Sequence, residues 1–195
     1  MFYHAIVFLP LFAAIAAGVA SLYQKHNFAT FVTISSVCLS LILSCFAFAA
    51  IAIGGQAEVI QVARWIESGD FQAHWTLRFD TLTAVMLIVV TGVSSCVHIY
   101  SVGYMSHDPA RGRFMAYLSL FTFAMLMLVT ADNLVQLFFG WEGVGVASYL
   151  LIGFWYHKES AHTAAMKAFV VNRVGDFGFA LGIVSIFALM GSVQF

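Results

Sequence analysis

The chain has 195 residues, of which 62% are hydrophobic and 9% carry a charged side chain, and its formal net charge is −1. Soluble domains contain about 25% charged residues, so this composition excludes an ordinary soluble enzyme and indicates an integral membrane protein. A net charge near zero gives no electrostatic basis for binding nucleic acid. Two prolines and long apolar runs predict an all-α, polytopic transmembrane helix bundle rather than a barrel.

Six apolar runs are long enough to cross a bilayer, because about 20 helical residues span its hydrocarbon core. The predicted spans are residues 3–23, 28–53, 82–104, 114–131, 134–156 and 164–190. The first run lacks the basic leader and cleavage site of a signal peptide, so we expect it to be retained as an anchor. The chain therefore divides into two transmembrane helices (1–53), an extramembrane loop (54–80) and four further transmembrane helices (81–195) that contain the buried charges.

The loop at 54–80 is polar and interleaves charged with aromatic side chains. Its segment from Gln72 to Phe79 has some of the polar and apolar alternation of a strand. Ser68, Gly69 and Asp70 are typical of a turn. These two signals predict a β-hairpin outside the membrane.

The distribution of basic residues predicts how the chain is oriented, because basic loops are retained on the cytoplasmic side. The odd-numbered connections contain four basic residues, whereas the even-numbered ones contain two that are offset by four acidic residues. The four are Lys25, Arg111, Arg113 and Lys158. The amino terminus is therefore expected on the outer side, in the periplasm or the intermembrane space.

Glu142 is an isolated carboxylate near the middle of the fifth predicted span, with no other charged side chain between Asn133 and Tyr156. Holding a carboxylate at membrane depth costs several kcal/mol of desolvation, so such a residue lines an ion pathway or has a specific buried partner. Its own span offers no cation, so the partner must come from another helix. The alternative is a purely structural carboxylate paired with a neighbouring lysine or arginine.

The last predicted span contains three charged residues, Lys167, Arg173 and Asp176, in an otherwise apolar stretch. Arg173 and Asp176 are three residues apart and share a helix face, where they can neutralise each other. Such a pair either takes part in a proton pathway or only fixes helix packing. Lys167 lies about 9 Å along the helix axis from Arg173, so it either joins the pathway through water or reaches the headgroups.

The remaining polar residues of the apolar segments predict structure rather than chemistry. His98 is expected to be a polar packing residue rather than a proton relay, and Asp132 with Asn133 predicts a tight turn and a helix cap. The three cysteines have neither paired spacing nor nearby histidines, so we expect buried structural thiols. They are Cys38, Cys45 and Cys96.

Glycines surround Glu142 and recur in the last span, at positions 140, 143, 145, 175, 178 and 182. No strand precedes the first three, so a phosphate-binding loop is excluded. Small residues instead allow close helix contact or leave room for water beside the acid. The sequence has no nucleophile with an adjacent base and no flavin, haem or metal ligand pattern, so any redox chemistry must belong to partner proteins.

Two long motifs resemble the antiporter-like, proton-conducting subunits of respiratory complex I. They are NLVQLFFGWEGVGVASYLLIGFWY at residues 133–156 and AAMKAFVVNRVGDFG at residues 164–178. The segments LRFDTLTAVM (77–86) and HIYSVGYM (98–105) are similar to the same proteins. Within the family the likeness is greatest to the distal subunit, called subunit L in bacteria and chain 5 in mitochondria, and it extends over nearly the whole chain.

The resemblance implies that the chain helps to translocate protons during electron transfer from NADH to quinone. Glu142, Lys167, Arg173 and Asp176 match the charged pathway positions of the family. Such subunits hold no prosthetic group, and NADH, FMN, iron–sulfur clusters and quinone bind elsewhere in the assembled complex. The partners implied are other membrane-arm subunits, including a neighbouring antiporter-like subunit, in a bacterial or mitochondrial inner membrane.

The resemblance also implies a longer protein. In the family the half-channel continues into a seventh and an eighth helix, one of which supplies a buried lysine as the usual partner of the fifth-helix glutamate. The chain is therefore expected to be an amino-terminal portion, an antiporter-like half-channel fragment, from a split gene, a truncated remnant or a partial sequence. The alternatives are a multi-subunit cation/proton antiporter, a membrane-bound hydrogenase and a non-conducting membrane piece.

Overall fold

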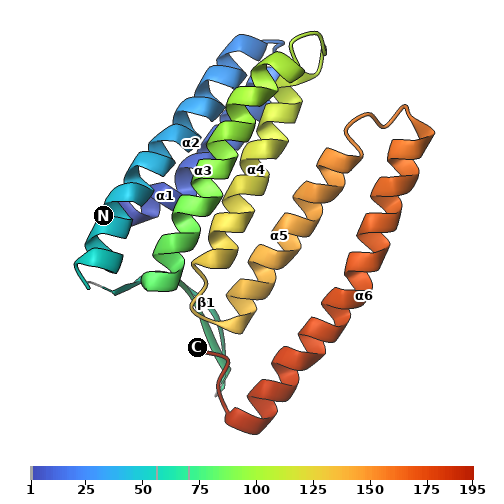
Figure 1. The fold of residues 1–195 in the computed structure, drawn as a ribbon. Coiled ribbons are helices and arrows are strands. Elements are labelled where there is room, and N and C mark those ends of the chain that lie inside the picture. Colours follow the sequence, from blue (N-terminus) through green and yellow to red (C-terminus); the bar gives the residue numbers. More distant parts are fainter. Residues whose placement is uncertain (1, 56, 70) are drawn as a thin grey trace.

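The structure is a computed structural model that describes residues 2–55, 57–69 and 71–195. Within these residues, six long helices and one β-hairpin make up the fold (Figure 1). The helices are α1 (Phe2–Leu22), α2 (His26–Phe48), α3 (Thr81–Tyr104), α4 (Arg111–Val129), α5 (Leu134–Ile152) and α6 (Glu159–Met190), and α2 continues into a π-helical segment, η1 (Ala49–Ile53). All six long helices are long and apolar enough to cross a membrane. The predicted helical membrane bundle with six spans is therefore confirmed.

Side-chain caps determine where two of these helices begin. Asp80 precedes α3 and accepts a hydrogen bond from the Thr83 N–H at 2.8 Å. Asn133 precedes α5 and accepts one from the Gln136 N–H at 2.8 Å. Each cap satisfies a backbone N–H that has no partner inside the helix. The cap predicted at the turn between the fourth and fifth spans is confirmed, with Asn133 as the capping residue.

The long connection between α2 and α3 contains an antiparallel hairpin of β1 (Glu58–Ser68) and β2 (Phe71–Phe79). The strand expected at residues 72–79 is present as β2. Gly69, in the turn, has a φ of 59°, which glycine adopts without the steric cost that other residues carry. Asp70, which we placed in the same turn, lies outside the described residues.

The hairpin is attached to the junction of α4 and α5 by hydrogen bonds. The Arg78 N–H donates to the Thr130 carbonyl at 2.9 Å. The Thr76 N–H donates to the buried Gln136 side chain at 3.0 Å, and Asn133 Nδ2 donates to the His74 carbonyl at 2.8 Å. An isolated hairpin is marginally stable in water, so these bonds hold it in place and at the same time fix the start of α5.

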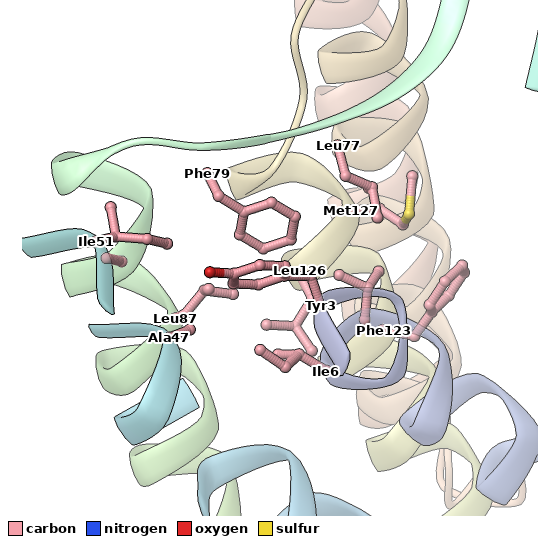
Figure 2. Packing of buried hydrophobic residues seen from close by; sticks show 12 residues of the cluster. Tyr3, Ile6, Ala47, Ile51, Leu77, Phe79, Leu87, Phe123, Leu126 and Met127 are labelled. Atoms are coloured by element: carbon pink, nitrogen blue, oxygen red, sulfur yellow. The ribbon is translucent and has the colours of Figure 1, made fainter. Parts of the chain in front are cut away.

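The main hydrophobic core lies at the hairpin end of the α1–α4 bundle (Figure 2). Tyr3 and Ile6 from α1 contact a cluster to which α2, α3, α4 and β2 all contribute. Phe79 of β2 is fully buried there, and its ring centroid is 4.6 Å from that of Tyr3. The inner strand of the hairpin is therefore part of the core, and its position relative to the helices is fixed.

Helix α5 packs on α4 through glycine. A Cβ atom added to Gly140 would lie 2.6 Å from the Leu128 Cα, and one added to Gly143 would lie 3.1 Å from the Ala124 Cβ. The close helix contact predicted for glycines near Glu142 is confirmed at these two positions. A Cβ atom added to the α6 glycines at positions 175, 178 and 182 would meet no other element within 4 Å in the described part of the chain.

Helix α6 packs against α5 and leans away from the four-helix bundle (Figure 1). Its buried residues are Ala165, Asp176 and Ile183. One of the three is a carboxylate, and charged side chains are rarely buried unless they are paired. The position of Asp176 therefore identifies the contact between α5 and α6 as a chemically distinct part of the fold.

The cysteines depart from the prediction of buried thiols. All three are free, but Cys45 and Cys96 are exposed and Cys38 is half-buried. An apolar segment identifies a membrane helix without telling which of its faces points inward, because the face toward lipid is as apolar as the core. The prediction was therefore wrong for Cys45 and Cys96.

Candidate functional site

Glu142 on α5 and Arg173 on α6 form an ion pair between the two helices. The Arg173 Nη1 donates a hydrogen bond to the Glu142 Oε1 at 2.7 Å. The Glu142 side chain is 21% exposed and that of Arg173 is 47% exposed. The sequence required a partner from another helix without identifying it, and within the described residues this partner is Arg173.

Arg173 is shared with a second carboxylate on its own helix. Its Nε lies 3.7 Å from the Asp176 Oδ2, and the Asp176 side chain is only 6% exposed. The predicted pairing of these residues across one helix turn is therefore confirmed. The Arg173 guanidinium also lies over the Phe169 ring, 4.8 Å from its centroid, and this contact limits the positions that it can take.

Trp141 completes the cluster, and the sequence analysis gave it no role. Its Nε1 donates a hydrogen bond to the Asp176 Oδ1 at 3.0 Å, so one oxygen of that carboxylate contacts α5 and the other faces Arg173. A tryptophan beside an intramembrane acid was the available signal, because indole N–H groups in apolar surroundings usually find an acceptor. What the sequence could not give was the register of α5 against α6, which decides the acceptor.

The cluster combines two carboxyl groups with one guanidinium. With both carboxyls ionised its net charge is −1, and an uncompensated charge in surroundings of low polarity is costly. Such a site lowers its energy by taking up a proton or by meeting a further cation. The arrangement can therefore bind and release a proton in response to the position of a neighbouring cation.

A small cavity lies against the cluster between α5 and α6. Its volume is about 120 Å³, and Trp141, Ser148, Asn172, Arg173 and Asp176 contribute polar groups to its lining. One water occupies about 30 Å³ in the liquid, so several waters fit, and the lining offers them hydrogen-bond partners. Space for water beside paired charges is what a proton needs to reach or leave such a site.

Lys167 lies outside this cluster. It is exposed on α6, and no carboxylate lies within ion-pair distance of it in the described residues. It precedes Arg173 by six positions, so its part in a proton pathway stays a prediction.

His98 is fully buried between α3 and α4. Its Nδ1 lies 2.8 Å from the Ser94 carbonyl, and its Nε2 lies 3.0 Å from the Ser119 hydroxyl. Both ring nitrogens therefore have partners, and the contact with Ser119 joins α3 to α4. This geometry fits the packing role predicted for it.

A second group of charges, which the sequence analysis did not assemble, lies where the hairpin meets the helices. Arg78 Nε is 3.2 Å from the Asp80 Oδ2, and Arg78 Nη1 is 3.8 Å from the Asp132 Oδ1. The hydrogen bond from the Thr83 N–H lowers the pKa of Asp80 below its ordinary value. Burial raises the pKa of Asp132, and the Arg78 charge partly opposes that rise. These residues link the hairpin to both helix starts and lie apart from the Glu142 cluster.

No group of three or more histidine, cysteine, aspartate or glutamate side chains suited to a metal ion is found among the residues that the structure describes.

Two family models match the sequence. Residues 65–115 match the model described as the N-terminus of chain 5 of NADH-ubiquinone oxidoreductase (complex I). Residues 131–195, which include the Glu142 cluster, match the model described as the transmembrane region of NADH:quinone oxidoreductase and the Mrp antiporter.

Two relatives show how much of a longer protein the chain represents. It is 54% identical over 193 residues to NADH-ubiquinone oxidoreductase chain 5 of Arabidopsis thaliana, covering 99% of this chain and 29% of the relative. It is also 54% identical over 196 residues to NADH-quinone oxidoreductase subunit L of Rhodobacter capsulatus, covering 97% and 27%. The chain therefore spans less than a third of the length of these curated relatives.

Solved structures share the fold at lower sequence identity. A membrane-bound sulfane sulfur reductase, an archaeal respiratory membrane complex, contains a chain with a TM-score of 0.83 and 18% identity, covering 97% of this chain and 37% of that one. The Mrp complex from a Dietzia species contains one with a TM-score of 0.80 and 22% identity, covering 99% and 20%. At these identities the likeness establishes the helical arrangement alone.

Proposed function

We propose that this chain takes part in proton translocation. It belongs to the family of antiporter-like membrane subunits that includes chain 5 and subunit L of NADH:quinone oxidoreductase, and the proposal starts from that membership. In this proposal, electrons pass from NADH to quinone in partner subunits, which hold the FMN and the iron–sulfur clusters. The chain itself contributes the charged groups that take up and release protons. It acts as the amino-terminal part of that subunit.

The observation that carries the proposal is the cluster of Glu142, Arg173 and Asp176 between two membrane-spanning helices. A single guanidinium there serves two carboxyls, at 2.7 Å and 3.7 Å, beside a cavity large enough for water. A purely structural ion pair requires neither a second carboxyl nor hydrated space. Intramembrane ionisable residues with these neighbours are typical of proton pathways.

The proposed step is an exchange of the Arg173 guanidinium between its two partners. When it lies against Glu142, the ionised form of that carboxyl is stabilised. When it moves toward Asp176 or outward, Glu142 loses its compensation and protonation is favoured. Redox energy released in the partner subunits would bias this movement, and Lys167 would supply a further cation along α6, about 9 Å away at 1.5 Å per residue.

The proposed setting is the inner membrane of a bacterium or a mitochondrion. The partners would be other membrane-arm subunits, a neighbouring antiporter-like subunit among them, together with the remainder of a longer subunit. Lys25, Arg111, Arg113 and Lys158 would face the cytoplasm or matrix, which leaves the amino terminus on the outer side.

A cation/proton antiporter is the second candidate. One matching family model is described for both NADH:quinone oxidoreductase and the Mrp antiporter. The Glu142 cluster would serve either protein. Proton movement that depends on NADH separates the two, because an antiporter instead exchanges protons for another cation without NADH.

The test is the Glu142→Gln substitution in the assembled complex, with Glu159→Gln as the matched control. Glu159 is an exposed acid in the first turn of α6 and takes no part in the cluster. NADH-dependent proton uptake into membrane vesicles is measured beside NADH oxidation with an artificial acceptor, and assembly is followed on native gels. We expect E142Q to assemble, to oxidise NADH and to pump poorly, whereas E159Q pumps normally.

Proton pumping by E142Q at the wild-type rate would overturn the proposal and favour a non-conducting membrane piece. If E142Q does not assemble, E142D is tested in its place, because it keeps the negative charge on a shorter side chain. Pumping by E142D should then be reduced, because its carboxylate lies farther from Arg173.

A further inference from the structure

A second cavity, of about 200 Å³, lies where α4 begins, α5 ends and α6 begins. It shares no lining residue with the smaller cavity that Arg173 and Asp176 line. Its polar lining comes from one arginine, one histidine and three tyrosines: Arg113, His162, Tyr117, Tyr149 and Tyr156. Every one of these side chains can donate a hydrogen bond, and none carries a negative charge at neutral pH.

Arg113 is the cation of this cavity, and the described part of the chain places no anion against it. Its guanidinium Cζ lies 4.8 Å from the Phe154 ring centroid and 5.6 Å from that of Tyr156, and its Nη2 donates to the Phe154 carbonyl at 3.3 Å. Within residues 2–55, 57–69 and 71–195, no carboxylate lies within 4.0 Å of it, and its buried Nε has no hydrogen-bond partner. Aromatic rings therefore hold the guanidinium in place while leaving its charge and a donor unused.

The position of the cavity puts it at the level of the lipid headgroups. It lies at the ends of three membrane-spanning helices, on the side where the connections from α1 to α2, α3 to α4 and α5 to α6 meet (Figure 1). Further basic residues of this end are Lys25, Arg111 and Lys158. Trp155 and Tyr156 in the same connection are typical of the membrane interface.

We propose that this cavity binds the phosphate of an anionic phospholipid headgroup. Arginine binds phosphate through paired N–H donors, and basic pockets between membrane helices at the cytoplasmic face suit anionic headgroups. Tyrosine hydroxyls and His162 supply further donors around the phosphate oxygens. Met166 and Val170 are exposed and follow His162 at intervals of four residues, so they extend an apolar helix face along which acyl chains can lie.

Free inorganic phosphate shares the chemistry of the headgroup, so the test must separate the two sources. The assembled complex is purified from membranes in mild detergent, and the retained phospholipids are counted by mass spectrometry. We expect Arg113→Gln to lose about one anionic phospholipid per copy of the chain. The matched control, Arg111→Gln, removes the same charge two residues away at a position that does not line the cavity, and it should retain the lipid.

Delipidated complex then distinguishes lipid from free phosphate. Phosphatidylglycerol should raise the melting temperature of the wild type and not that of R113Q, whereas phosphatidylcholine and inorganic phosphate should raise neither. Equal lipid retention by wild type and R113Q overturns the proposal. An equal rise with inorganic phosphate overturns the lipid as the source.

Variants with smaller changes keep the proposal testable if R113Q does not assemble. Arg113→Lys keeps the charge without the paired donors, and Tyr117→Phe removes one hydroxyl from the lining. We expect both to retain less anionic lipid than the wild type, and unchanged retention in both overturns the proposal. Because the measurement is lipid retention, its outcome is independent of whether Glu142 moves protons.

Discussion

Replacing Gly140 by alanine tests whether direct contact between helix backbones fixes the position of α5. A Cβ at this position would lie 2.6 Å from the Leu128 Cα, 2.7 Å from its nitrogen and 2.8 Å from its Cβ. Carbon atoms in ordinary contact are about 3.5–4.0 Å apart, so α5 must move by about 1 Å. The obstructing atoms belong to the α4 backbone and to the first atom of its side chain, so no change of rotamer relieves the contact.

Overpacking by one carbon costs about 1–3 kcal/mol, and the better helix propensity of alanine offsets up to about 1 kcal/mol of it. We therefore expect G140A to be less stable than the wild type by about 1–2 kcal/mol. Gly18→Ala is the matched control, because Gly18 also lies inside a membrane helix and has no neighbour within 4 Å of an added Cβ in the described residues. This control should be as stable as the wild type or slightly more stable.

The assay is thermal unfolding of the assembled complex in nanodiscs, followed by proton pumping in vesicles. Glu142 is two residues from Gly140, and a displacement of about 1 Å at a reacting group can lower a rate by about 100-fold. G140A should therefore pump more slowly even where it assembles. Equal melting temperatures and equal pumping for G140A and G18A would refute the argument that this contact positions the acid.

Substitutions at three other positions test separate contacts. Asp80→Ala should cost about 1 kcal/mol at neutral pH through loss of the α3 cap. Because the hydrogen bond from Thr83 lowers the pKa of Asp80, the stabilisation from the cap is complete above about pH 4 and is lost as the pH falls through the lower folded pKa. The melting curves of the variant and the wild type should therefore converge in acid. Gln136→Leu leaves the Thr76 N–H buried without an acceptor, at a cost of about 1–3 kcal/mol, and should accelerate hydrogen exchange in β2. Arg173→Met leaves two carboxyls without their cation and should abolish pumping, whereas Arg173→Lys should retain part of it.

The helices could be predicted from the sequence because each is a long apolar run, and length and composition alone identify a membrane span. The ends were less certain for a physical reason. Helix α6 begins at Glu159, five residues before the predicted span, since its polar first turns continue the helix beyond the apolar segment. The cap at Asn133 was predictable because the residue type and the turn are both local features.

The contacts within the site depend on which faces of α5 and α6 meet, and a single sequence does not contain that information. Spacing alone predicted that Arg173 and Asp176 share a helix face. The pairing of Arg173 with Glu142 joins residues 31 positions apart, and the bond from Trp141 to Asp176 joins residues 35 positions apart. Both follow from the angle at which α6 packs on α5, and the exposure of Cys45 and Cys96 depends on helix rotation in the same way.

The two sides of α5 are held by different kinds of contact, and this difference bears on the role proposed for Glu142. On one side, glycine contacts with α4 and hydrogen bonds to the hairpin hold α5 in place. On the other side, α6 contacts α5 through the shared guanidinium and through aromatic rings such as those of Tyr149 and Phe169, whose centroids are 5.5 Å apart. The acid thus lies on the helix that is packed on both sides, and its counter-charge lies on the more exposed helix. At an effective dielectric constant of about 20, separating a unit ion pair from 2.7 Å to about 5 Å weakens its attraction by roughly 3 kcal/mol, or about 100-fold in an equilibrium constant. A movement of α6 or of the Arg173 side chain by about 2 Å would therefore weaken the compensation of the Glu142 charge by this amount, without any rearrangement of the α1–α4 bundle.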